Sequence, residues 1–522
     1  MARFAVSGAR TIPENATAIG GPAHWWRAWS QALALLLAMA AAVAVALYLF
    51  VPPEVVPASA PVTEFSAERA MEDVRVIAKE PHPMGSPEHE EVADYIANRL
   101  EKLGLSPEVQ ETTGLRYNEG EQFHAGRVKN ILARIPGTDN TGAVLLVGHH
   151  DSMPTTNADG GISTATVLET VRAIQAGPSL KNDVIVYVGD ADVNGVIGAT
   201  SYREHPWSQD VGVGFAFEGI GSYSPSALVY EGQAVADPGP DVSTSPQTPD
   251  LEAFPAPRNG WWLSEALKAL PRPLIILPVN DVLFLAGNAS PELATLLVGT
   301  DGAGLGFGQF RGSAAYHTIL DNPERLDPRS LQHQGFNALS LTRHFGNLPL
   351  NEAEQQATPS LVAFNVWPGG VVAYPSTWAL SLAVAIAVLF AAFLGVGFLR
   401  GRLKVGALLL GIVLFVLGVI GTVVVTTLAW KFGIAINPTY QVWMGRGYYG
   451  ADWHLLYFTA LTVAFFSALY LLARRFIRAA RNDESTAAGR SSSWCFSRFS
   501  PVWKYPRLAT SSPGPRLRGC SY

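Results

Sequence analysis

Three apolar segments of the chain end in residues that could bind a metal ion. The segments are 143–147, 184–188 and 214–217, and each has the length of a buried strand. The residues that follow them are His149 and Asp151, Asp190 and Asp192, and Glu218, respectively. Imidazole and carboxylate groups are the ligands that zinc and similar divalent ions accept when cysteine is absent. A single residue of this kind also fits an ordinary hydrogen-bonded loop, so the indication of a metal centre comes from the recurrence at successive strand ends.

Two further candidate ligands lie in loops that lead into helices. Asp159 belongs to the glycine-rich turn 157–161, which precedes a helix expected from Ser163. His317 precedes an amphipathic segment near the end of the same region. Asp159 also fits ordinary turn chemistry, and Glu218 also fits a helix cap.

The elements that must position these residues alternate between strands and helices. Apolar residues at helical spacing predict helices over 89–103 and 163–176, each followed or ended by a glycine. The runs 130–135, 143–147 and 184–188 predict strands, and the last two read as continuously buried. A strand, a helix and a strand in that order form a parallel crossover unit, which makes the domain α/β. The carboxyl ends of such strands are where reactive residues gather.

Several motifs in this order resemble peptidase family 28, which comprises co-catalytic zinc aminopeptidases and carboxypeptidases. The segment 147–152 (VGHHDS), the following Asp159-Gly-Gly and the helix through Glu169 resemble the family's metal-binding core. Supporting matches are Pro81–Ser86, Gly195–Ala199, His205–Trp207, Ala315–Asp321 and Leu326–Gly335. The resemblance covers about residues 65–348 and implies a mixed, mostly parallel sheet with helices on both faces. With flanking apolar segments, the chain is similar to the membrane-anchored subgroup that includes vacuolar and endoplasmic-reticulum members.

The resemblance also implies roles for the candidate residues. His149 and Glu218 would bind one zinc ion, His317 would bind a second, and Asp159 would bridge the two. Asp151 would orient His149 from behind.

The chain departs from the family at the pair of glutamates that supplies the general base and a ligand of the second zinc. Asp192 and Val193 occupy these positions. Asp192 would serve as the base, whereas valine has no lone pair for a metal. We therefore expect one tightly bound zinc and a second that is weak or absent, unless Asp192 or Asp190 turns to fill the vacant position. Tyr316 is a candidate contact for substrate or, equally, a packed aromatic residue.

Composition limits the remaining classes of function. The chain has 522 residues, of which 48% are hydrophobic and 15% charged, and this balance indicates membrane segments. Its net charge of −6 gives no basic surplus for binding nucleic acid. Its two cysteines, Cys495 and Cys520, lie near the C-terminus, so a metal in the main domain must be held by His, Asp and Glu.

Four uncharged apolar runs have a length suited to crossing a bilayer. They cover residues 32–51, 378–399, 405–430 and 455–472. Arg and Lys cluster before the first run, between the second and third, and after the fourth. Because such clusters favour the cytoplasmic side, we expect both termini in the cytoplasm and the domain 53–370 outside it.

The remaining segments are expected to be peripheral. Residues 1–31 would form a cytoplasmic N-terminal segment, 232–260 a surface insertion, and 474–522 a disordered cytoplasmic tail. The change of character near Arg490 predicts a truncation or a reading-frame change there.

Two functions fit these observations. The first is a membrane-anchored zinc metallo-exopeptidase that hydrolyses peptides with metal-activated water. The alternative is a catalytically impaired relative that serves as a binding or scaffold ectodomain, because of Val193. Both have membrane lipid as a neighbour, and the sequence leaves the oligomeric state and the recognised peptide end open.

Overall fold

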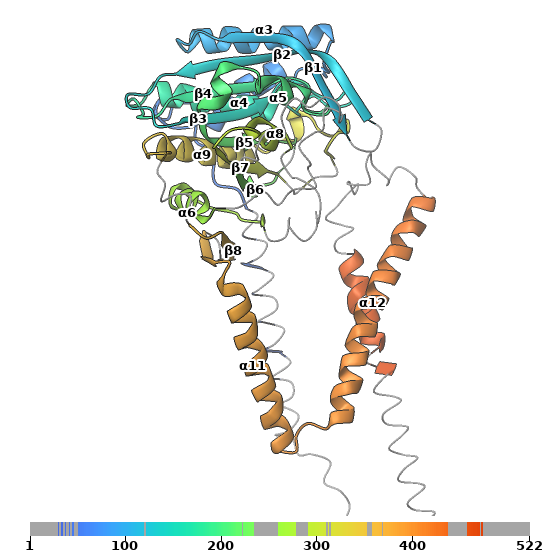
Figure 1. Cartoon of the computed structure of the whole chain (residues 1–522). Coiled ribbons are helices and arrows are strands. Elements are labelled where there is room, and N and C mark those ends of the chain that lie inside the picture. Colours follow the sequence, from blue (N-terminus) through green and yellow to red (C-terminus); the bar gives the residue numbers. More distant parts are fainter. Residues whose placement is uncertain are drawn as a thin grey trace, which may run out of the picture. The chain divides into compact units, whose positions relative to one another are not determined.

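The computed structural model, shown in Figure 1, describes most of the region between residues 51 and 436. The described ranges are 51–118, 122–221, 223–233, 259–277, 291–309, 315–351, 358–367, 369–436 and 457–469, with a few single positions besides. The contacts divide the chain into two compact units, residues 1–395 with 437–452, and residues 396–436 with 453–522.

A seven-stranded sheet forms the centre of the first unit, in the order β1-β2-β4-β3-β5-β7-β6. The strands are β1 (Glu108–Asn118), β2 (Gln122–Ile135), β3 (Ala143–His149), β4 (Val184–Gly189), β5 (Val211–Phe217), β6 (Ala227–Gln233) and β7 (Ala303–Gly308). The central strands β4, β3, β5 and β7 are mutually parallel, while β2 and β6 run antiparallel to them. The expected mixed sheet with a parallel centre is confirmed.

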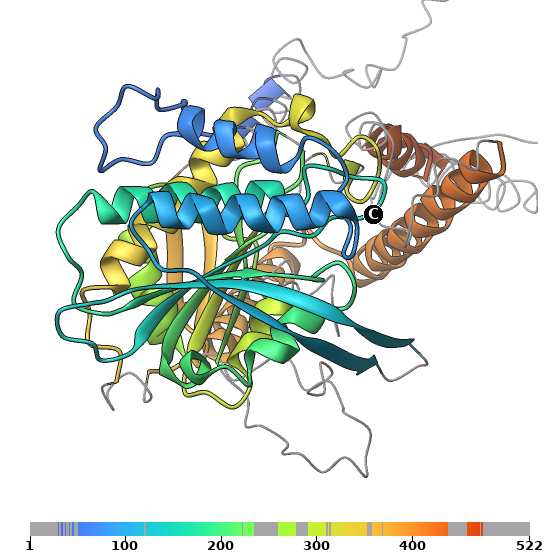
Figure 2. The same cartoon turned by 90° about the horizontal axis from the view of Figure 1, so that it is seen from above.

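Helices cover both faces of this sheet. They are α2 (Ala67–Ile77), α3 (Pro87–Lys102), α4 (Gly161–Gln175), α5 (Ile197–Tyr202), α6 (Gly260–Ala269), α8 (Pro291–Leu297) and α9 (Pro328–Phe345). The larger apolar core joins one face to α2, α3, α4, α6 and α9, and a second core joins the other face to α5 and α8. Figure 2 shows the long helices α3 and α4 crossing the sheet.

Burial on both faces explains why the central strands read as unbroken apolar runs. Along β3, Val144 and Leu146 enter the larger core, whereas Leu145 and Val147 enter the second. Because side chains of a strand alternate between the two faces and both faces are covered, apolar residues are favoured on each face of β3.

The predicted strand–helix–strand unit is present as β3, α4 and β4. Strands β3 and β4 pair in parallel, and His149 lies opposite Gly189 at their carboxyl ends. The helix predicted over 89–103 is α3, which begins after the capping side chain of Ser86. The amphipathic segment after His317 is α9. These predictions are confirmed with boundary shifts of a few residues.

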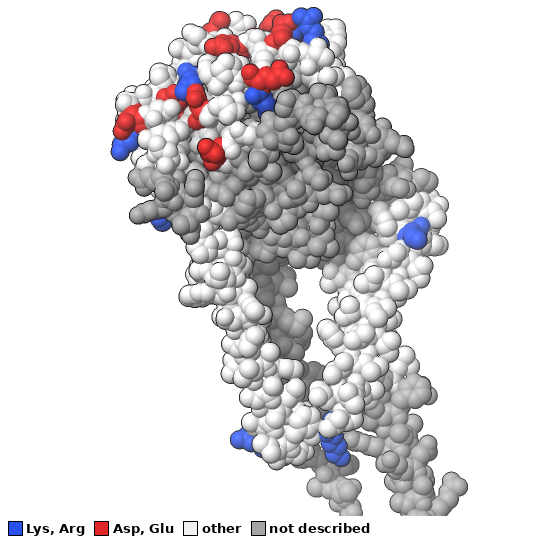
Figure 3. Space-filling view, viewed as in Figure 1, with Lys and Arg blue, Asp and Glu red and all other residues white. Residues whose placement is uncertain are grey.

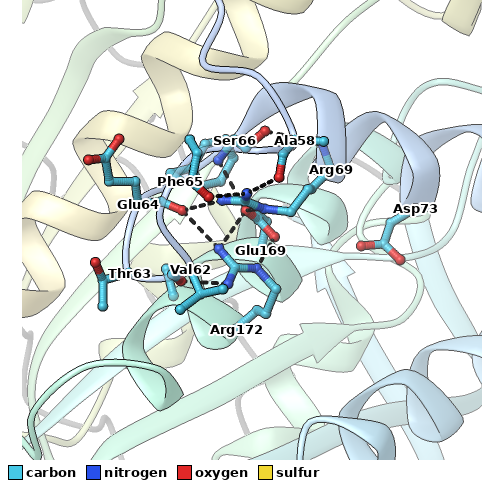
Figure 4. Close-up of polar contacts among 12 residues, drawn as sticks. Ala58, Val62, Thr63, Glu64, Phe65, Ser66, Arg69, Asp73, Glu169 and Arg172 are labelled. Atoms are coloured by element: carbon cyan, nitrogen blue, oxygen red, sulfur yellow. Dashed lines mark hydrogen bonds and ion pairs between the residues drawn. The ribbon is translucent and has the colours of Figure 1, made fainter.

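A buried ion pair network ties the segment before α2 to helix α4 (Figure 4). Glu169 of α4 is fully buried and bonds Arg69 Nε at 2.9 Å and Arg172 Nε at 2.6 Å. It also accepts a hydrogen bond from the backbone N–H of Ser66 at 3.0 Å. The two guanidinium groups donate in turn to backbone carbonyls of residues 58–64. The Glu169 carboxylate therefore holds the segment that leads into α2 against helix α4.

Beyond the domain, a hairpin of β8 (Leu361–Trp367) and β9 (Gly370–Pro375) precedes two long apolar helices. These are α11 (Trp378–Leu399) and α12 (Val405–Ile436). Within the described part of the chain, α11 and residues 408–436 are long and apolar enough to cross a membrane, which indicates membrane association. On the face seen in Figure 3, Asp and Glu gather over the globular domain and are absent from these helices.

The other two predicted spans are described only in part. The helix over 457–469 is shorter than a full span, and only scattered helical positions are described within 32–51. Helix α12 continues beyond the predicted end at residue 430 and includes Lys431. Residues 1–29, 234–258 and 473–522 lie outside the described residues, so the predicted insertion and both predicted terminal segments stay predictions.

The Glu169 network generates a stability prediction. Changing Glu169 to Ala leaves two largely buried guanidinium groups without their carboxylate, so the free energy of unfolding should fall by about 3–5 kcal/mol. The matched control is Glu111→Ala, because Glu111 pairs with Arg127 at an exposed position and should cost less than about 1 kcal/mol. Urea unfolding of both variants measures the difference. Equal losses would contradict this account of the network.

Candidate metal centre

The carboxyl ends of β3, β4 and β5 place the predicted polar residues at one edge of the sheet. His149 is the last residue of β3, and β4 ends opposite it at Gly189. Glu218 follows the end of β5, where its backbone N–H donates to the carbonyl of Phe307 on β7 at 2.8 Å. The parallel register of these strands thus brings residues about seventy positions apart to the same edge.

His149 lies at the middle of this group. Its side chain is 1% exposed, and its Nδ1 lies 3.2 Å from Asp151 Oδ1. Its Nε2 lies 3.6 Å from Asp159 Oδ1 and 3.8 Å from Glu218 Oε2, yet has no hydrogen-bond partner among the described residues. With Nδ1–H donated to Asp151, Nε2 presents a lone pair toward two carboxylates, which is an arrangement that a cation between them would complete.

The two oxygens of Asp159 face two different histidines. Oδ1 is directed at His149, and Oδ2 lies 3.3 Å from His317 Nε2. Asp159 is placed by Gly160, whose φ of 74° turns the chain into α4. A Cβ at Gly160 would lie 2.6 Å from the carbonyl oxygen of Asp151, so glycine is needed for this approach.

The buried carboxylate of Asp151 connects His149 to the loop after β4. Besides His149, it accepts hydrogen bonds from the backbone N–H groups of Asp192 at 2.9 Å and Val193 at 3.2 Å. These interactions hold the pKa of Asp151 below its usual range in spite of burial, which acts in the opposite direction. Asp151 therefore stays charged and fixes both the ring and the loop.

Asp192 joins His149 and Glu218 in a group whose potential ligand atoms all lie within 4.8 Å of one another. One oxygen of Asp192, Oδ1, is buried without a hydrogen-bond partner in the described structure. Burial raises the pKa of Asp192 well above its usual range, and the charge of Glu218 adds to this against the opposing effect of His149. The pKa of Glu218 is raised in the same way, chiefly by burial.

The backbone is strained beside these residues. Among the described residues, the non-glycine residues with positive φ are Ala191 (55°), Val196 (51°) and His317 (58°). Two of them flank the loop of Asp192, and the third is a candidate ligand. Backbone strain of this kind costs on the order of 1–3 kcal/mol per residue and clusters at functional sites.

Three further candidates from the sequence, Val193, Asp190 and Tyr316, have contacts of their own. Val193 lies in the loop after β4, where its backbone N–H donates to Asp151 at 3.2 Å. Asp190 does not turn toward the centre, because its oxygens bond His89 Nε2 at 2.9 Å and the backbone N–H of Lys129 at 2.8 Å. The ring of Tyr316 stacks on that of His317 with centroids 3.7 Å apart and is 36% exposed.

Two buried carboxyl groups beside the centre were not assigned roles from the sequence. Glu292 reaches over the end of β4, since a Cβ on Gly189 would lie 2.6 Å from its Oε1. Asp321 accepts a hydrogen bond from the backbone N–H of Gly221 at 2.6 Å. Burial raises the pKa of both groups well above the usual range, with further contributions from Asp192 and Asp159, respectively. The sequence around Glu292 does not indicate a role at the centre, because acidic residues are common in the first turn of any helix.

The donor set fits zinc. It offers two imidazoles and two carboxylates, contributed by separate segments, and the buried Nε2 of His149 lacks any other partner in the described structure. Nitrogen and oxygen donors of these types, oriented by a carboxylate behind a histidine, are typical of zinc sites that activate water. The centre therefore has the composition required for metal-assisted hydrolysis.

Comparisons with known proteins agree with this chemistry. Residues 130–246 match the sequence model of the family described as "Peptidase family M28". The chain is 24% identical over 294 residues to a vacuolar membrane protease of Candida dubliniensis, covering 54% of this chain and 28% of that protein. It is 27% identical over 295 residues to a vacuolar membrane protease of Schizosaccharomyces japonicus, covering 53% and 31%. The matched part of the chain thus spans less than a third of the length of these relatives.

Among solved structures, a zinc aminopeptidase from Bacillus subtilis aligns with 56% of this chain and 98% of its own, at 13% identity and a TM-score of 0.39. A glutaminyl cyclase from Porphyromonas gingivalis aligns with 53% and 97%, at 17% identity and a TM-score of 0.36. The family match includes the segment from β3 to Glu218, where His149, Asp159 and Asp192 lie. Residues 130–246 are therefore similar to peptidase family M28.

Proposed function

We propose that this protein is a membrane-anchored zinc metallo-exopeptidase of the aminopeptidase type. The observation that carries the proposal is the arrangement around His149 and Asp159. His149 Nε2 faces two carboxylates, while the second oxygen of Asp159 faces His317. These pairwise contacts link four side chains from separate segments, and the family match supports a peptidase.

In this proposal His149 and Glu218 hold one ion, and Asp159 lies between it and a second position at His317. When bound, zinc supplies a Lewis acid that polarises the peptide carbonyl and makes water more acidic. Asp151 fixes the His149 ring so that Nε2 presents its lone pair to the ion.

Asp192 is proposed as the group that moves the proton. Its carboxylate takes a proton from the attacking water and delivers it to the nitrogen of the departing amine. The backbone bond from Asp192 to Asp151 keeps this side chain beside His149 and Glu218.

The second metal position is proposed to be weak. His317 and Asp159 supply two protein ligands there, and Val193 offers none. Since catalytic zinc sites commonly have three protein ligands, one ion should bind tightly and another poorly. Tyr316, which is partly exposed beside His317, is proposed to contact the peptide substrate.

We further propose four membrane spans, at 32–51, 378–399, 405–430 and 455–472, with both termini in the cytoplasm. The helices α11 and α12 and the cluster Arg400, Arg402 and Lys404 between them support this topology. The domain 53–370 would then meet peptides outside the cytoplasm.

Removal of the metal tests the proposed function most simply. Chelation of the purified full chain should abolish hydrolysis of aminoacyl anilides, and added zinc should restore it. Asp159→Asn should lower kcat/KM by about a hundredfold or more, because it weakens a ligand shared by two positions. Asp139→Asn, at an exposed site, is the matched control and should retain activity. If Asp159→Asn keeps both its zinc and its activity, the assignment of Asp159 as a ligand is wrong. If the wild-type chain itself is inactive, the scaffold alternative is favoured.

Substitution of Val193 tests the weak second position. Val193→Glu supplies the missing carboxylate and should raise both the bound zinc per chain and kcat. Val193→Gln has the same shape without the charge and should gain neither. Zinc content by mass spectrometry and steady-state kinetics measure the two effects. Identical behaviour of the two variants would show that residue 193 does not face the metal.

Labelling with a membrane-impermeant maleimide tests the topology. In a chain with Cys495 and Cys520 replaced by Ser, Asp139→Cys should react in intact cells. Arg402→Cys should react only after permeabilisation, because it lies in the predicted cytoplasmic loop. The reverse pattern would place the domain in the cytoplasm.

A further inference from the structure

A second cluster of metal-binding side chains lies outside the proposed zinc centre and shares no residue with it. It consists of His89 on α3, His150 after β3 and Asp190 after β4. Their exposed fractions are 2%, 0% and 1%, respectively. One potential ligand atom from each residue lies within 4.8 Å of the others.

Each histidine in this cluster has one ring nitrogen engaged and one buried without a partner. His89 Nε2 bonds Asp190 Oδ1 at 2.9 Å, and His150 Nε2 bonds the backbone carbonyl of Lys129 at 3.0 Å. In both rings Nδ1 is buried and has no hydrogen-bond partner among the described residues. His150, which donates Nε2–H to a carbonyl, keeps Nδ1 as the lone pair that binds metals, whereas in His89 an ion shared with Asp190 would take the place of the proton between Nε2 and the Asp190 carboxylate.

A single buried histidine of this form is not enough to indicate a site. His333 on α9 also has one engaged nitrogen, bonded to the carbonyl of Arg272 at 3.0 Å, and a buried Nδ1 without a partner. It belongs to neither of the groups of potential ligands found among the described residues. The distinguishing feature of His89 and His150 is therefore their shared position with a buried carboxylate.

The geometry needs only a modest change to accommodate an ion. The rings of His89 and His150 lie with centroids 4.8 Å apart. Donor atoms around a tetrahedral zinc ion are separated by about 3.4 Å, given zinc–ligand distances near 2.0–2.1 Å. Side-chain rotation of roughly 1 Å would close the difference. Asp190 is already held by its second oxygen, which accepts from the backbone N–H of Lys129.

The cluster also has a path to solvent. His89 lines a pocket of about 290 Å³ together with Gly85, Glu90, Glu111, Arg127 and Lys129. The two glutamates of this pocket are paired with Arg127 and Lys129, so its wall carries balanced charge and does not repel a cation. An entry path is one of the features that a credible metal site requires.

We propose that His89, His150 and Asp190 form a second binding site for a divalent transition-metal ion such as zinc, separate from the hydrolytic centre. Two imidazoles and one carboxylate suit zinc and leave a fourth position for water. The ion would join α3 to the ends of β3 and β4. Because Asp190 and Asp192 belong to one loop, this site would brace the backbone that carries the proposed proton acceptor. The inference goes beyond the proposed peptidase activity and does not depend on it.

Metal counting in a background without the hydrolytic centre tests the site. The full chain carrying His149→Asn and His317→Asn is purified in detergent, stripped with a chelator, reloaded with zinc and desalted. We expect this background to retain about one zinc ion per chain. Adding either His89→Asn or His150→Asn should remove that ion. Adding His333→Asn, the matched buried histidine, should leave it in place.

A second measurement needs no substitution within the cluster. Zinc should raise the thermal midpoint of the His149→Asn/His317→Asn background, since a ligand that binds only the folded chain stabilises it. A background that holds no zinc and shows no thermal shift would overturn the site. Zinc that persists after both His89→Asn and His150→Asn would also overturn it. Retained zinc in the background together with an inactive wild-type chain would support this site and refute the peptidase proposal.

Discussion

The concentration of buried and half-buried carboxylates at one edge of the sheet is the constraint on which the rest of the structure depends. Asp151, Asp159, Asp192 and Glu218 lie within reach of a single imidazole, and burial and mutual repulsion raise the pKa of the last two. Such a group stays fully ionised only beside a compensating cation, and without one some of its members take up protons. A divalent ion would resolve this conflict, and His149 Nε2, which has no hydrogen-bond partner among the described residues, is proposed as its ligand.

The scaffold serves this constraint in two ways. The parallel centre of the sheet brings strand ends that are distant in sequence to one edge, and the glycine turn before α4 lets Asp159 approach from the side. Asp151 then links the β3 end to the β4 loop through one carboxylate. Ala191, with its strained φ of 55°, directly precedes the backbone N–H groups that Asp151 holds. A change at Asp151 therefore affects both His149, the proposed metal ligand, and Asp192, the proposed proton acceptor.

The sequence predicts much of this fold because the signals are local. Doubly covered strands read as apolar runs, and the glycine-rich turn at Asp159 marks where a helix begins, whereas the capping role of Ser86 emerges only from the structure. The interactions of Asp190 with His89, 101 residues away, have no local signal, so the alternative that Asp190 turns toward the centre could not be excluded beforehand. The position of Glu292 beside the centre could not be predicted for the same reason, because it depends on how α8 packs over the end of β4.

The central claim is that His149, Asp159 and Glu218 converge on one cation. Anomalous diffraction at the zinc absorption edge, from crystals of the full chain grown with zinc, tests it most directly. The account predicts a zinc peak about 2.0–2.2 Å from His149 Nε2 and from one oxygen each of Asp159 and Glu218. An ordered site in which these three side chains surround no anomalous peak would contradict it.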